Sequence, residues 1–159
     1  MEFYTIGVYG SNEKDFFNKL IQNGIDTFCD IRQRRGVRGS EYSFVNSTYL
    51  QAKLHDLDIK YGHELLLAPT SEIREAQKIA DANENVSKRS RETLGAVFTS
   101  LYKNNILSTF DLDAFIDRLD EIGADKIALF CVETKPRACH RSLVGDAIKE
   151  KYGFNVIDL

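Results

Sequence analysis

The chain has 159 residues, a length that suits one compact domain and leaves little room for a second. Its hydrophobic content of 43% and charged content of 28% are typical of a globular protein rather than a disordered one. The net charge of −3 gives no overall attraction to nucleic acid or to anionic lipid, so any site for an anion must be local.

The amino-terminal residues lack the pattern of a secretion signal, and no stretch of 18 apolar residues occurs. Three cysteines cannot all pair with one another, which favours reduced thiols. We therefore expect one α/β domain over residues 1–159, in a cytoplasmic protein with no membrane partner. The sequence does not predict an oligomeric state.

Strand-like and helix-like segments alternate along the chain. Residues 3–9 form a β-rich apolar run, and residues 10–12 then offer turn residues and a helix cap. Apolar residues at helical spacing continue up to Gly24, and residues 25–31 repeat the strand pattern. Charge and glycine mark residues 32–40 as a loop.

The second half of the pattern contains a long charged stretch. A second amphipathic helix is predicted around residues 49–57, and a short third strand at residues 59–63. Residues 73–107 form a charged helical excursion, with a break near residues 83–87. The remaining predicted elements are a helix that ends at Gly123, a strand at residues 126–132, a helix at residues 138–152 and a strand at residues 154–157.

Strands separated by helices require a mostly parallel sheet, because parallel neighbours need crossover connections. We expect a three-layer, Rossmann-like α/β fold, in which helices cover both faces of a mostly parallel five-stranded sheet. The expected strand order is 3-2-1-4-5, since the first three strands can wind in one direction before the excursion reverses it. Ligands bind such sheets beyond the carboxyl ends of the strands.

The segment from residue 126 to residue 146 gives the strongest indication of a functional site. A buried apolar strand, residues 127–132, leads into a short polar loop and then into a helix. The unpaired N–H groups and the dipole at the start of a helix favour bound anions and thiolates. The polar side chains at this junction are Cys131, Glu133, Arg137, Cys139, His140 and Arg141.

Polar side chains also follow the earlier strands, and carboxyl ends of parallel strands share one edge of a sheet. Ser11 follows the first predicted strand, and Asp30 and Arg32 end the second. We therefore expect these groups to converge in one cleft. The expected anion-binding residues are Ser11, Arg32, Arg137 and Arg141, and the expected chemical groups are Asp30, Glu133, Cys139 and His140.

At these residues the chain resembles the domain of unknown function 488 family. The shared segments are Thr5-Ile6-Gly7, Asp30-Ile31-Arg32, and a C-x-E…P-x-x-C-H-R signature from Cys131 to Arg141. The resemblance covers nearly the whole chain and implies a fold and a site rather than an activity. The chain departs from the family pattern at residues 8–11, where members often have histidine and serine, and at the unusually basic residues 33–38.

Thiol chemistry is one use of the carboxyl-terminal cluster. Cys131 and Arg137 have a spacing similar to that of cysteine phosphatase loops, but Glu133 would repel phosphate and the loop has no glycine. Cys139 is better placed for activation, because it lies in the first turn of the predicted helix beside His140.

Carboxylate and metal chemistry are the other uses. Glu133 or Asp30 can serve as base or nucleophile while arginines hold a phosphate, although Asp30 and Arg32 equally suit a structural ion pair. Cys131, Glu133, Cys139 and His140 are competent metal ligands, but no C-x-x-C or H-x-x-x-H spacing occurs, and Cys139 and His140 are expected to point apart on a helix. We therefore expect no metal and no cofactor.

A basic loop supports a non-enzymatic alternative. Arg32, Arg34, Arg35 and Arg38 precede several aromatic residues, and a second basic group spans residues 88–91. Arginines bind phosphates and aromatic rings stack on bases. The loop can equally be a solvated surface segment whose positive charge is balanced by the 24 acidic residues of the chain. The leading expectation is an intracellular hydrolase or transferase acting on a phosphate-bearing small molecule, a nucleotide or a nucleic-acid component. The alternative is a nucleic-acid-binding or accessory module.

Overall fold

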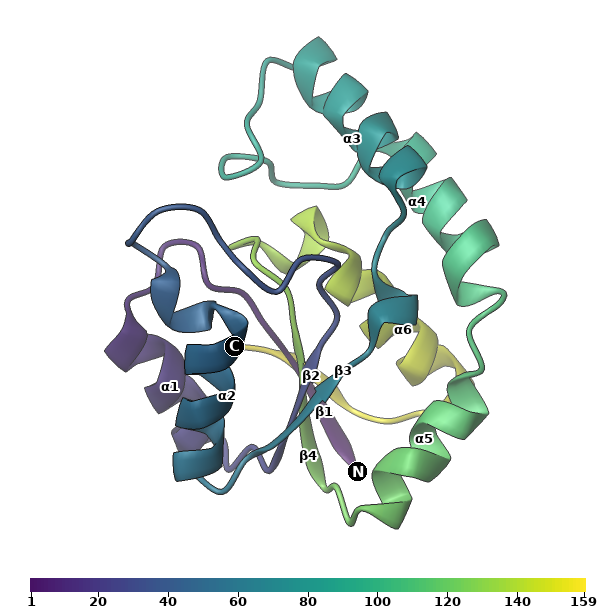
Figure 1. Ribbon diagram of the computed structural model, residues 1–159. Helices are drawn as coiled ribbons and strands as arrows, with labels where there is room; N and C mark the ends of the chain where they lie inside the picture. The colour runs from purple at the N-terminus through teal and green to yellow at the C-terminus, as the bar shows by residue number, and fades with distance from the viewer.

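A computed structural model describes residues 1–159, in which a five-stranded sheet lies between two layers of helices (Figure 1). Every pair of neighbouring strands is parallel, so the predicted three-layer α/β fold is confirmed. The strands are β1 (Glu2–Ile6), β2 (Thr27–Asp30), β3 (Lys60–His63), β4 (Lys126–Phe130) and β5 (Val156–Asp158).

The strand order is β3-β2-β4-β1-β5, and the expected order of 3-2-1-4-5 is wrong. β4 lies between β2 and β1, with Ile127 opposite both Thr27 and Phe3. Because residues 127–130 are fully buried, β4 suits a central position with a neighbour on each side. The carboxyl end of β4 is therefore flanked by the ends of both β1 and β2.

Helices cover both faces of the sheet (Figure 1). α1 (Glu13–Gln22) and α2 (Ser47–Asp56) lie on one face, and α5 (Leu112–Glu121) and α6 (His140–Tyr152) lie on the other. α1 begins where the Asn12 side chain accepts a hydrogen bond from the amide of Asp15. Three 3₁₀ turns, η1 (Ser43–Val45), η2 (Leu65–Leu67) and η4 (Pro136–Ala138), complete the connections.

The charged excursion forms α3 (Ser71–Asn83) and α4 (Ala96–Tyr102), and α4 continues into a π-helical turn, η3 (Lys103–Leu107). Figure 1 shows the two helices side by side beyond the carboxyl ends of the strands, with the connecting residues 84–95 on the side that faces the sheet. The Gly95 amide donates to Gln77 Oε1 at 2.8 Å, and the Tyr102 hydroxyl donates to the Leu67 carbonyl at 2.6 Å. These contacts hold the excursion together and attach it to η2.

The core contains an aromatic cluster under α1. The Phe16 and Phe28 rings each lie within 6 Å of the Phe130 ring, at centroid distances of 5.5 and 5.1 Å. All three side chains are fully buried, so this cluster ties α1 to β2 and β4. No helix combines the length and the apolar character needed to cross a membrane.

Candidate functional site

A cavity of about 740 Å³ lies at the carboxyl ends of β2 and β4, and residues of the excursion also line it. Eight of its lining side chains are basic and two, Asp81 and Glu133, are acidic. A chain with a net charge of −3 therefore surrounds this cavity with positive charge. The basic residues are Arg32, Arg34 and Arg38 after β2, Arg74 and Lys78 on α3, and Lys88, Arg89 and Arg91 in the loop after α3.

Cys131, Cys139 and His140 form part of the cavity wall, where all three are buried. The Cys139 sulfur lies 3.8 Å from His140 Nδ1, and His140 Nε2 lies 3.0 Å from the Ile31 carbonyl oxygen. A carbonyl oxygen only accepts hydrogen bonds, so Nε2 carries a hydrogen and Nδ1 faces the thiol. This arrangement suits proton exchange between the imidazole and the sulfur.

The surroundings of Cys139 favour a thiolate. Burial by itself would raise the pKa of this thiol, but hydrogen bonding with Cys131 and the positive charges of His140 and Arg141 together hold the pKa well below its usual range. The hydrogen bond with Cys139, and burial, raise the pKa of Cys131 well above its usual range. Burial lowers the pKa of His140, but the charge and hydrogen bond of Cys139, together with the Glu133 charge and the Ile31 carbonyl, more than offset it and the pKa is raised. Cys139 is therefore the thiol that ionises first.

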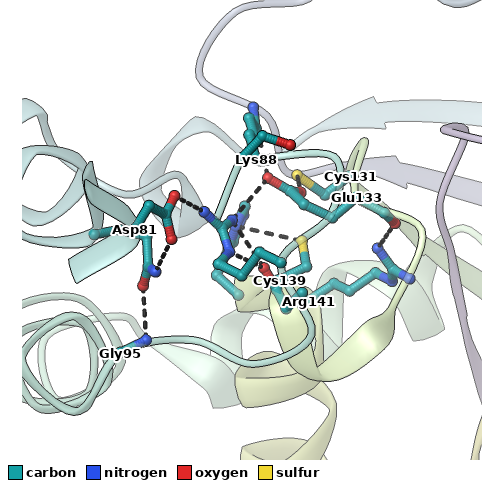
Figure 2. A network of polar contacts seen from close by, with 12 residues as sticks. Asp81, Lys88, Gly95, Cys131, Glu133, Cys139 and Arg141 are labelled. Atoms are coloured by element: carbon teal, nitrogen blue, oxygen red, sulfur yellow. Dashed lines mark hydrogen bonds and ion pairs between the residues drawn. The ribbon is translucent and has the colours of Figure 1, made fainter. Parts of the chain in front are cut away.

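Glu133 lies between the thiols and Lys88, which belongs to the loop after α3 (Figure 2). Its Oε2 accepts from the Cys131 thiol at 3.2 Å, and its Oε1 lies 3.5 Å from Lys88 Nζ and 3.4 Å from Arg91 Nη2. Burial is the main cause of a raised pKa for this carboxyl, reinforced by the Cys139 charge and opposed by Lys88. Glu133 is therefore suited to give and take a proton.

Arg91 joins the excursion to the wall of the cavity. Its Nη1 lies 2.7 Å from Asp81 Oδ2, and its Nη2 donates to the Ala138 carbonyl at 2.9 Å (Figure 2). The sequence prediction did not include this role, nor the side chains of Arg74, Lys78 and Asp81 on α3. Their spacing of four and three residues places them on one helix face, which is the signal that could have indicated them.

Arg32 carries an unpaired hydrogen-bond donor. Its guanidinium stacks on the Phe130 ring at 4.5 Å, and its Nη2 donates to Asp30 Oδ2 at 2.7 Å and to the Val45 carbonyl at 3.0 Å. Arg32 is only 4% exposed, lines the cavity, and has no hydrogen-bond partner for Nη1. A buried donor of this kind is rare in folded proteins, and it leaves one polar group of this residue without a partner in the chain.

Asp30 has a different setting from the other expected chemical groups. It is fully buried, accepts from Arg32 and from the Tyr61 hydroxyl, and does not line the cavity. Its carboxylate holds the guanidinium of Arg32 in place. Glu133, Cys139 and His140, by contrast, are brought together at the cavity wall.

The remaining expected residues fall outside the cavity. Arg141 is fully buried and donates to the Thr5 hydroxyl and to the carbonyls of Glu133 and Thr134. Arg137 is exposed, and Ser11 lies in a separate hollow of about 310 Å³. In the basic loop, Arg34 and Arg38 line the main cavity and Arg35 does not.

The ligand atoms of Cys131, Cys139 and His140 all lie within 4.8 Å of one another, close enough to share a metal ion. Cys139 precedes the first residue of α6 and has an extended backbone, so its side chain faces His140 rather than pointing away as a helical neighbour would. The basic side chains around the cavity oppose the binding of a divalent cation at this position.

A family model described as "Domain of unknown function DUF488" matches residues 12–148. The match includes the Asp30 to Arg32 segment and the signature from Cys131 to Arg141, and it begins after the first shared segment at residues 5–7. No curated protein and no solved structure matches the chain.

Proposed function

This chain belongs to the DUF488 family, and on that premise we propose that it is an enzyme acting on a phosphate-bearing substrate, with Cys139 as its nucleophile. The observation that carries the proposal is the position of the Cys139 sulfur, beside His140 at the wall of a cavity with eight basic side chains. A thiolate reacts with an electrophilic centre, and cationic groups offset the charge of a phosphate that approaches it.

Arg32 supplies a reason to expect an anionic ligand rather than a neutral one. Asp30 and Phe130 hold its guanidinium in position, and its unpaired Nη1 offers a donor to an oxygen once the atoms that cover it move. Arg34, Arg38 and Lys88 are more exposed and add charge around the opening. A ligand with several negative oxygens would bind Arg32 and these more exposed cations at the same time.

The proposed reaction is hydrolysis or transfer of a phosphate ester. The Cys139 thiolate attacks phosphorus, the bond between phosphorus and the leaving oxygen breaks, and the leaving alcohol takes the proton of the Glu133 carboxylic acid. Water, or an acceptor alcohol, then attacks the cysteinyl phosphate and gives its proton to the Glu133 carboxylate. This second step releases phosphate, or the new ester, and restores the Cys139 thiolate.

An aromatic pair favours a nucleotide or a nucleic-acid component as the substrate. Tyr9 and Tyr42 line the cavity with ring centroids 5.2 Å apart, and the Arg89 guanidinium lies over both rings at 5.1 and 5.5 Å. Aromatic rings and arginine planes also stack on bases. A non-catalytic nucleic-acid-binding role through Arg34 and Arg38 is the second candidate, and it predicts binding without turnover.

The test of catalysis measures phosphate release from p-nitrophenyl phosphate and from nucleoside mono-, di- and triphosphates. We expect Cys139→Ser to lower the rate by at least about a hundredfold, because a hydroxyl in this site is not ionised. Cys29→Ser is the matched control, since Cys29 lies in β2 and does not line the cavity. Turnover that survives in Cys139→Ser would disprove the nucleophile, and an absence of turnover with binding intact would favour the second candidate.

The test of anion binding compares two variants of equal charge. Arg34→Ala/Arg38→Ala and Arg35→Ala/Arg137→Ala each remove two positive charges, but only the first pair lines the cavity. Calorimetry with inorganic pyrophosphate should show affinity about tenfold lower in the first variant and within about twofold of the parent in the second, with steep weakening as salt rises. Equal losses in both variants would mean that no local phosphate site exists.

A further inference from the structure

The two cysteines of the cavity wall lie close enough to react with each other. Cys131 follows β4, Cys139 precedes α6, and their sulfurs are no more than 4.8 Å apart. A disulfide needs a sulfur separation of about 2 Å, so the two sulfurs have to approach each other by less than about 3 Å. Both side chains line the cavity, so a small molecule that enters it reaches this pair, whereas Cys29 lies elsewhere in the core.

The hydrogen bonds of Cys131 suit it to attack a neighbouring sulfur. Its thiol donates to the Glu133 carboxylate at 3.2 Å, and its sulfur lies no more than 4.8 Å from the sulfur of Cys139. When the hydrogen passes to Glu133, the Cys131 sulfur becomes a nucleophile directed at Cys139. Glu133 thus serves the pair as a base, and the adjacent Lys88 and Arg91 stabilise its charge before it accepts the proton.

We infer that Cys139 is an oxidation site for hydroperoxides, that Cys131 converts the oxidised sulfur into a disulfide, and that this disulfide switches the enzyme off. The loss of activity rests on the proposed function, because the disulfide consumes the proposed nucleophile. The formation of the disulfide rests only on the positions of the two sulfurs, His140 and Glu133.

The oxidation takes place in two balanced steps. The Cys139 thiolate attacks one peroxide oxygen, so that a sulfur–oxygen bond forms and the oxygen–oxygen bond breaks, and the leaving alkoxide or hydroxide takes the His140 proton. The Cys131 sulfur then attacks the Cys139 sulfenic acid, whose hydroxide leaves as water with the proton that Glu133 received. Two electrons from the thiol pair reduce one hydroperoxide to an alcohol and water.

The charge of the cavity favours this chemistry over metal binding at the same atoms. Basic side chains stabilise the thiolate that attacks the peroxide, and hydrogen peroxide is uncharged and therefore not repelled. A bound phosphate should compete with the peroxide for space above Cys139. Substrate would then protect the enzyme from oxidation.

The test treats the full chain, freed of reductant, with hydrogen peroxide and maps its cysteines by mass spectrometry after blocking free thiols. We expect a link between the Cys131 and Cys139 peptides, which dithiothreitol reverses, with Cys29 still reduced. Cys131→Ser should yield no such link but a sulfenic acid at Cys139 that dimedone captures, while Cys29→Ser should behave like the parent. Inorganic pyrophosphate should slow the oxidation severalfold.

The outcomes separate this inference from the proposed function. A parent chain in which the two peptides never become linked, or in which Cys29 oxidises equally fast, would disprove it. Zinc that copurifies and blocks both thiols would also disprove it, because the pair would then be a metal site. If the link forms but the reduced chain hydrolyses no phosphate ester, the inference stands and the catalytic proposal fails. If the reduced chain hydrolyses a phosphate ester and no link forms, the catalytic proposal stands and this inference fails.

Discussion

The buried guanidinium of Arg141 donates a hydrogen bond to the carbonyl oxygen of Glu133 at 2.6 Å. A cation in the first turn of α6 therefore fixes the backbone of the loop that carries Glu133. The same guanidinium donates to the Thr5 hydroxyl on β1, so it joins three elements of the fold around the thiol pair. No carboxylate pairs with Arg141, and its charge is one of the causes that lower the pKa of Cys139.

Arg141→Met should therefore destabilise the fold. Three internal acceptors lose their donor, so we expect the free energy of unfolding to fall by roughly 3 kcal/mol. Arg137→Met removes the same charge from an exposed position and should change it by less than about 0.5 kcal/mol. Denaturant titration measures both. Equal stability in the two variants would mean that Arg141 has no structural role.

Alkylation by iodoacetamide should distinguish the thiols. Because the pKa of Cys139 lies well below its usual range, its thiolate persists as the pH falls through neutrality, and Cys139 should react faster there than Cys131, whose pKa is raised. His140→Gln removes a positive charge beside the sulfur and should shift the profile of Cys139 to higher pH. Peptide mass spectrometry reads each site, and a Cys139 profile like that of a free thiol contradicts the prediction.

Gly7→Ala should disrupt the close approach of the residue after β1 to the loop that carries Glu133. A Cβ at Gly7 would lie 2.0 Å from the Glu133 carbonyl oxygen, a backbone atom that cannot move without displacing the loop. We expect a loss of about 2 kcal/mol or more in the free energy of unfolding. Gly62→Ala is the matched control, because nothing lies within 4 Å of its added Cβ. Similar thermal unfolding of both variants would contradict this close contact.

Asp81→Asn should loosen the excursion from the cavity wall. Arg91 would lose its closest carboxylate, at 2.7 Å, in a largely buried setting. We expect trypsin to cleave within residues 84–95 several times faster than in the parent, since opening of this loop exposes its basic residues. Glu75→Gln removes a solvent-exposed pair with Lys78, worth at most about 1 kcal/mol, and should leave the cleavage rate unchanged. Equal cleavage of both variants would show that the Arg91 pair does not anchor the loop.

The alternation of elements and the local cluster of reactive groups can be predicted from the amino-acid sequence alone. Apolar runs and helical spacing are local properties, so the five strands and the helices of the fold could be recognised without coordinates. Glu133, Cys139 and His140 lie within eight residues, from the loop after β4 to the first residue of α6, and a short segment at a strand end brings such neighbours to one place. Their grouping therefore needed no long-range information.

The strand order and the set of arginines that face the cavity depend on how the chain packs in three dimensions. The pattern of a buried strand is the same wherever it lies in a sheet, so nothing local places β4 between β1 and β2. Arg141 and Arg32 were both predicted to bind an anion. In the structure Arg141 donates its hydrogen bonds to groups inside the fold, whereas Arg32 keeps one donor, Nη1, unpaired. Arg91 reaches Glu133 from 42 residues away because the excursion folds back over the strands. These differences depend on side-chain direction and long-range packing, which local sequence patterns do not encode.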